Sequence, residues 1–169
     1  RDRLRSRGLG DVYKRQVYFG IPYETDVLYL YVAHPIARMK ELPYREICGE
    51  HAPLCTTGIG KAILANLPPE EWLSRLPEIV PAHTPQTITD KDKILQELQS
   101  TRERGFAIDN CEHELNVRCV GVPVYNARGA LVAGISSSGA VQVMTDRKVM
   151  ECADILMGIT QRIKERLYA

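Results

Sequence analysis

The sequence predicts one α+β domain built on an antiparallel sheet. Stretches rich in β-branched and aromatic residues come in two groups, one near each end of the chain, and neighbours within a group are spaced like hairpins. Helical stretches lie between and after these groups rather than alternating with single strands, as they would around a parallel sheet. The length of 169 residues and the hydrophobic fraction of 44% are those of a single folded domain.

The first half of the chain is expected to form three strands and then a helix. Residues 17–23 and 27–32 have strand composition and are separated by a short polar turn, so they predict a hairpin. Residues 44–47 are predicted to form a third short strand. A helix is predicted over residues 61–66, after a run of small and polar residues.

Two further helices are expected before the second group of strands. Pro69-Glu70-Glu71 has proline and acids where a helix start prefers them. Thr89 is predicted to cap the next helix, with Asp92 three residues later as in a capping box. Its apolar face is predicted to hold Ile94, Leu95 and Leu98, and Gly105 is expected to end it.

The second half is expected to form three strands and a long final helix. Strands are predicted at residues 106–109, 117–125 and 130–138, the last two joined by a turn at residues 126–129. Thr145 is predicted to cap the final helix. Its apolar residues recur at helical spacing and are Val149, Cys152, Ala153, Leu156, Ile159, Ile163 and Leu167.

The charge of the chain is uneven. Residues 1–16 contain six basic and two acidic side chains and no apolar periodicity, whereas residues 17–169 carry a net charge of −3. A basic arm for nucleic acid is one hypothesis for the first segment, and a non-native tail is the favoured one. We therefore place the domain at residues 17–169, which lack the basic character of a nucleic-acid-binding domain.

Cysteine usage and hydropathy favour a cytoplasmic protein. The five cysteines are odd in number and contain no CxxC pair, which is unlike a secreted disulfide framework. No apolar run approaches the ~20 residues that a membrane span needs. The sequence shows no secretory signal, so we predict no membrane association.

Two segments have the composition of an anion site. Thr56-Thr57-Gly58-Ile59-Gly60-Lys61 precedes a helix, whose free amides and positive dipole end can bind an anion, although Thr56 or Thr57 could instead simply cap the helix. Ser136 and Ser138 lie on one face of a strand because side chains alternate with period 2. Their hydroxyls suit a carboxylate or carbonyl ligand, or else the strand's own backbone.

A third segment, residues 109–119, is unusually polar for a connection between strands. Cys111, His113 and Cys119 keep a metal site open as an alternative, with three ligands at irregular spacing. Asp109 or Glu112 could act as a general base in a small hydrolytic enzyme, but no partnered nucleophile is evident. A solvated loop is the simpler interpretation.

Several motifs together resemble the IclR family of bacterial transcriptional regulators. They occur in the family's order and spacing over nearly all of residues 17–169. The resembling segments are Pro53-Leu54, Thr57-Gly58-Ile59-Gly60-Lys61-Ala62-Ile63-Leu64-Ala65, Thr84-Pro85, Thr87-Ile88-Thr89, Thr101-Arg102, Arg104-Gly105-Phe106-Ala107-Ile108-Asp109, Glu112, Glu114, Val117-Arg118-Cys119-Val120, Pro123-Val124, Ala133-Gly134-Ile135-Ser136 and Ser138-Gly139.

The resemblance implies a GAF-like α+β effector-binding domain that is not an enzyme and needs no cofactor. Members of the family sense small organic acids, form homodimers or homotetramers, and bind operator DNA through an N-terminal winged helix-turn-helix. No such motif precedes residue 17, so this chain alone is expected to sense an effector without binding an operator.

The resemblance also implies which residues meet the effector. The carboxylate is expected at the amides of Gly58 and Ile59, at the hydroxyls of Ser136 and Ser138, and at Asp109. Cys119 is expected close to the ligand, with Leu54 and Val117 as apolar walls. A pure dimerisation module remains a further hypothesis, and it predicts apolar packing around Ser136 and Ser138.

Overall fold

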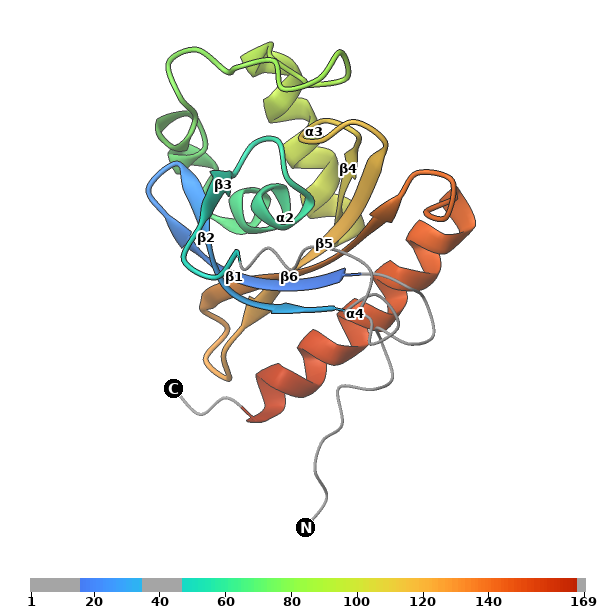
Figure 1. Cartoon of the computed structure of the whole chain (residues 1–169). Helices are drawn as coiled ribbons and strands as arrows, with labels where there is room; N and C mark the ends of the chain where they lie inside the picture. The colour runs from blue at the N-terminus through green and yellow to red at the C-terminus, as the bar shows by residue number, and fades with distance from the viewer. Residues whose placement is uncertain (1–15, 35–46, 167–169) are drawn as a thin grey trace.

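A computed structural model describes residues 16–34 and 47–166. Within these residues one antiparallel sheet has the strand order β3-β2-β1-β6-β5-β4 (Figure 1). The two predicted groups of strands each form half of this sheet and join where β1 pairs with β6. The strands are β1 (Gln16–Tyr23), β2 (Asp26–Ala33), β3 (His51–Pro53), β4 (Ala107–Asn110), β5 (Val117–Tyr125) and β6 (Leu131–Ala140).

Helices cover the two faces of the sheet unequally. The short helix α2 (Gly58–Asn66) packs on one face beside α3 (Lys91–Arg104), and the long helix α4 (Asp146–Arg166) crosses the other face (Figure 1). Two 3₁₀ turns, Pro69–Glu71 and Leu73–Arg75, lie between α2 and α3. No helix in the described parts of the chain is long and apolar enough to cross a membrane.

The face of the sheet that α4 covers is apolar. Alternate residues of β5, which are Val120, Val122 and Val124, are fully buried there against α4. The predicted apolar stripe of α4 supplies Val149, Cys152, Ala153 and Leu156 to this core, while Leu167 lies outside the described residues. The opposite face of β5 is therefore available to α2.

On that second face, small residues let α2 lie directly on the sheet. A Cβ atom at Gly121 of β5 would overlap the carbonyl oxygen of Gly58, and a Cβ atom at Gly58 would lie 3.0 Å from the Cβ of Cys119. Glycine at both positions brings the first turn of α2 against the backbone of β5. Ile59 and Ile63 then close the core beneath the helix.

Several sequence predictions need correction at element boundaries. The N-cap of α3 is Asp90, not Thr89, because the Asp90 carboxylate accepts a hydrogen bond from the Lys93 amide at 2.9 Å. The third strand is His51–Pro53, which pairs with β2, and Ile47 is outside any strand. Residues 44–46 lie outside the described residues.

Other boundaries are close to those predicted. Gly105 ends α3 with a φ of 85°, a left-handed conformation that glycine adopts readily. Helix α2 begins at Gly58, three residues before its predicted start. Thr145 lies immediately before α4, and its hydroxyl is 3.4 Å from the Lys148 amide.

Replacing Gly121 by alanine should lower the free energy of unfolding by more than ~2 kcal/mol, because the new methyl group meets backbone rather than a mobile side chain. Gly158→Ala is the matched control, since that glycine is exposed within α4 and a Cβ there meets nothing within 4 Å. Helix propensity predicts that the control is neutral or stabilising. Urea denaturation of both variants measures the difference, and equal stabilities would contradict the close packing of α2 on β5.

Candidate functional site

A row of polar side chains crosses the sheet on the α2 face. Asp109 lies opposite Cys119 on β5, and Cys119 lies opposite Ser138 on β6. Directly paired residues of antiparallel strands project from the same face, so these side chains are neighbours. Ser136 lies one step along the same face of β6, opposite Tyr18 of β1.

Most of the groups in this row are buried. Asp109, Ser136 and Ser138 are each less than 5% exposed, while Cys119 is partly exposed. The strand register places Cys119 between Ser138 and Asp109, and the Tyr18 hydroxyl donates a hydrogen bond to Gln16 Oε1 at 2.7 Å. Such polar surroundings differ from the apolar packing that a pure dimerisation module would place around Ser138.

The first turn of α2 brings backbone amides to this row. The Thr57 hydroxyl caps the helix by accepting a hydrogen bond from the Gly60 amide at 3.0 Å. The amides of Gly58 and Ile59 have no carbonyl four residues earlier within the helix to bond to. Because Gly58 adjoins Cys119, these amides and the positive end of the helix meet the polar row.

Asp109 is a carboxyl group with an unusual proton affinity. Burial is the main cause that raises its pKa to about 6. The nearby charge of Glu112 raises the pKa further, whereas the Glu112 amide, 2.7 Å from Oδ1, and the charge of Lys61 lower it. Asp109 can therefore exchange a proton close to neutral pH.

Two tyrosines from the first hairpin also face this site and were missed by the sequence analysis. The rings of Tyr18 on β1 and Tyr29 on β2 lie 5.5 Å apart between centroids. Burial raises the pKa of Tyr18 to about 12 and also raises that of Tyr29, so both hydroxyls stay neutral. The sequence did contain a signal for Tyr18. Side chains alternate between the two faces of a strand, so Tyr18 was bound to lie on the face opposite to Val17 and Phe19.

Leu54 and Val117, the apolar walls that the family resemblance implies, differ in burial. Leu54 is fully buried behind the first turn of α2, with its backbone against Gly60. Ile59 is also buried in that core. Val117 begins β5 opposite Ala140 and is partly exposed. The structure thus gathers Gly58, Asp109, Cys119, Ser136 and Ser138, and contact of any of these residues with a ligand stays a prediction.

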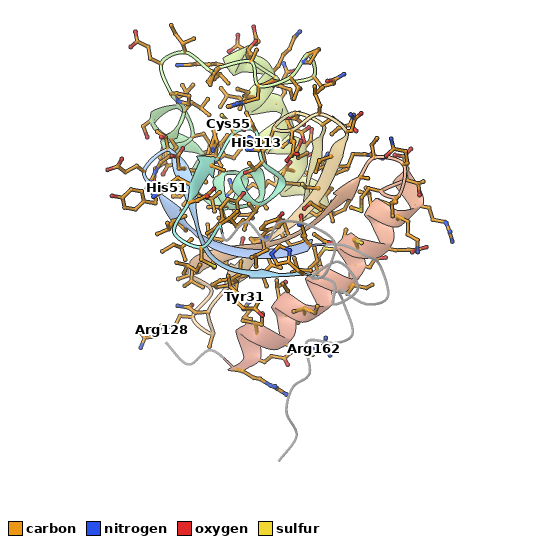
Figure 2. All side chains as sticks on the ribbon, viewed as in Figure 1. Tyr31, His51, Cys55, His113, Arg128 and Arg162 are labelled. Carbon is orange, nitrogen blue, oxygen red and sulfur yellow. The ribbon has the colours of Figure 1, made fainter. Side chains whose placement is uncertain are left out.

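The alternative of a metal site or hydrolytic enzyme is not supported. No group of three or more histidine, cysteine or acidic side chains that could hold a metal occurs among residues 16–34 and 47–166. The ring of His113, on the α2 side of the sheet in Figure 2, packs against His83, and its Nδ1 lies 3.2 Å from the Thr56 hydroxyl. Burial and His83 lower the pKa of His113.

The raised pKa of Asp109 predicts a specific dependence of stability on pH. Because the pKa of Asp109 is higher in the folded protein than the ordinary value of 3.8, its ionisation destabilises the folded state. This destabilisation is absent below pH 3.8 and complete above about pH 6, so the free energy of unfolding falls as pH rises. Asp109→Asn should therefore be about 3 kcal/mol more stable than the natural protein near pH 7.5 and equal to it near pH 3.5.

Urea denaturation at both pH values measures this difference, and Asp154→Asn, an exposed change on α4, is the control. If Asp109→Asn were destabilising near pH 7.5, a buried carboxylate with a raised pKa would be refuted.

Comparison with known proteins agrees with this architecture. The chain is 28% identical to the HTH-type transcriptional regulator KdgR of Escherichia coli over 165 residues, which are 97% of this chain and 62% of KdgR. The crystal structure of the KdgR C-terminal domain superposes with a TM-score of 0.82 at 27% identity, covering 95% of this chain and 92% of that domain. This chain therefore spans less than two thirds of the regulator that it matches.

Two other solved structures share the fold. The IclR protein of Thermotoga maritima is 31% identical, with a TM-score of 0.82 and coverage of 92% of this chain and 62% of that protein. The inducer-binding domain of PobR from Acinetobacter, a double mutant in complex with 3-hydroxybenzoic acid, has a TM-score of 0.79 over 94% of this chain and 97% of that domain. At 19% identity this second likeness shows the fold alone.

The family model for the C-terminal domain of the bacterial transcriptional regulator IclR matches residues 7–165, which is most of the sequence. The chain belongs to the family of IclR C-terminal domains.

Proposed function

We propose that this chain is the effector-binding domain of a DNA-binding transcriptional regulator, and that its effector is a small organic acid. The observation that carries the proposal is the meeting of a helix N-terminus with a row of buried neutral hydrogen-bonding groups on the sheet. A carboxylate satisfies such a set of donors well.

In this proposal the effector carboxylate binds the amides of Gly58 and Ile59 and the hydroxyls of Ser136 and Ser138. Both serines are buried on the face that α2 covers, which supports a common ligand. Asp109 and Cys119 then meet the polar remainder of the ligand, because they continue the same row across β5 and β4.

Apolar groups around the row would receive the carbon frame of the acid. Leu54 lies behind the first turn of α2 and Val117 begins β5, and the paired rings of Tyr18 and Tyr29 form a further wall. Short oxo acids, sugar acids and aromatic acids all remain candidates. The 3-hydroxybenzoate complex of the PobR domain supports an acid in a site of this fold.

Binding rather than catalysis is the activity that these groups favour. Burial, and then the charge of Asp109, raise the pKa of the Cys119 thiol well above its ordinary value. A thiol that stays protonated is a poor nucleophile. Asp109 accepts hydrogen bonds from the backbone amides of Glu112 and His113, and the thiol opposite it on β5, Cys119, stays protonated, which disfavours a nucleophile–base pair.

The response would pass from effector to DNA by a population shift. An effector that binds one arrangement of the domain better changes how paired domains sit in a homodimer or homotetramer. In the whole regulator, this change would move DNA-reading domains relative to their half-sites on operator DNA in the cytoplasm. This chain covers 62% of KdgR, which is consistent with separate domains for effector binding and DNA binding.

A thermal-shift screen tests the ligand class. Pyruvate, glyoxylate, gluconate and 4-hydroxybenzoate are added to the whole chain and to Ser138→Ala, with Ser100→Ala, an exposed change on α3, as control. A binding acid at about 100 times its Kd should stabilise the protein by ~2.7 kcal/mol. Ser138→Ala should weaken that binding about tenfold, and Ser100→Ala should not.

The outcomes separate the parts of the proposal. Binding that Ser138→Ala leaves unchanged would refute the location of the site, and the absence of stabilisation by any of the four acids would count against an organic acid as effector.

A further inference from the structure

A fully buried lysine lies immediately behind the candidate site. Lys61 of α2 is 1% exposed, and its Nζ is 2.6 Å from Oε1 of Glu112, in the connection between β4 and β5. Glu97 of α3 is a more distant partner at 3.6 Å, and it is shared with Arg104 at 2.7 Å. Lys61 is thus neutralised first by Glu112.

Glu112 is fixed in place from several sides. Its amide donates to Asp109 Oδ1 at 2.7 Å, and its carbonyl accepts from the Thr87 hydroxyl at 2.6 Å. Its Oε2 atom is buried with no hydrogen-bond partner among the described residues. Burial raises the pKa of Glu112, and the charge of Lys61 opposes that rise.

The two charges of the Lys61–Glu112 pair have opposite effects on the pKa of Asp109. The charge of Glu112 raises the pKa of Asp109, and the charge of Lys61 lowers it. Lys61 is the cation that lowers the pKa of Asp109. Because Lys61 is already paired with Glu112 at 2.6 Å, its charge is not available to balance an added anion.

The other titratable groups around Asp109 do not supply that cation. His113, from the same connection, has a lowered pKa, and Cys119 of β5 has a raised one. Tyr29 of β2 feels the charge of Asp109 and has a raised pKa as well. At neutral pH these three groups are uncharged.

We propose that Glu112, by neutralising Lys61, restricts the effector site to acids that carry a single negative charge. This inference rests on the proposed function. A second carboxylate beside Asp109 is tolerated only when one of the two takes a proton, because like charges at close range cannot both stay ionised. Asp109 takes that proton from solvent. A ligand with two negative charges brings one more negative charge than the protonation of Asp109 can offset.

The test uses Glu112→Gln, which keeps the shape of the side chain and frees the charge of Lys61. Isothermal titration compares pyruvate with oxaloacetate and 4-hydroxybenzoate with 4-hydroxyphthalate, so that each pair differs by one carboxylate. The monomethyl ester of each dicarboxylate controls for size. We expect the natural protein to prefer the single-charged acid at least about tenfold, and Glu112→Gln to reduce that preference by about tenfold.

Two control variants separate charge from shape. Glu97→Gln also removes a carboxylate near Lys61, but the 2.6 Å pair with Glu112 persists, so selectivity should be unchanged. Glu112→Asp retains the charge and should keep most of the natural preference. A folded Glu112→Gln protein with unaltered selectivity would overturn the inference, as would a natural protein that binds the dicarboxylates as well as the single-charged acids.

A second measurement needs no variant. Titration of the natural protein with the binding monocarboxylate, in two buffers of different ionisation enthalpy, should show uptake of about one proton per ligand near pH 7.5. Absence of uptake overturns the inference while the proposed function stands. If no monocarboxylate binds at any pH, the proposed function fails first and this inference fails with it.

Discussion

The contact between the first turn of α2 and β5 is the constraint on which the rest of the structure depends. Gly121 leaves no atom between the β5 backbone and the Gly58 peptide, so the helix end lies on the sheet itself. The alternation of β5 then sends valines to the α4 core and leaves Cys119 beside the helix. A bulkier residue at Gly121 would separate the amides of α2 from the serines of β6.

This close approach buries polar groups, and neighbouring polar groups compensate for their burial. Asp109 receives backbone amides, and Lys61 receives Glu112. Cys111, between those two acids, has a φ of 62°, a conformation that costs a residue with a side chain about 1 kcal/mol. Ion pairs at such depth contribute little net stability. The connection between β4 and β5 is therefore explained better by the candidate site beside it than by the stability of the fold.

Local patterns predicted the parts of this fold whose causes are local. Period 2 located β5 at its observed bounds, and glycine at position 105 located the end of α3. Where two neighbours can do the same chemistry, as Thr89 and Asp90 can at an N-cap, sequence does not choose between them. Strand β3 exists because it pairs with β2, and Lys61 meets a partner 51 residues away, so neither has a signal in its own segment.

The position of the candidate site suggests how a bound ligand would affect the rest of the domain. Tyr18 and Ser136 belong to the two halves of the sheet, which meet where β1 pairs with β6. Helix α2 contacts both halves, and through Lys61 it also reaches Glu97 on α3. A ligand held by α2 and both halves would favour arrangements in which all three are close, because its contacts are lost when any one withdraws. The seam between β1 and β6, rather than the long helix α4 on the opposite face, is thus the place where binding energy would change the shape of the domain.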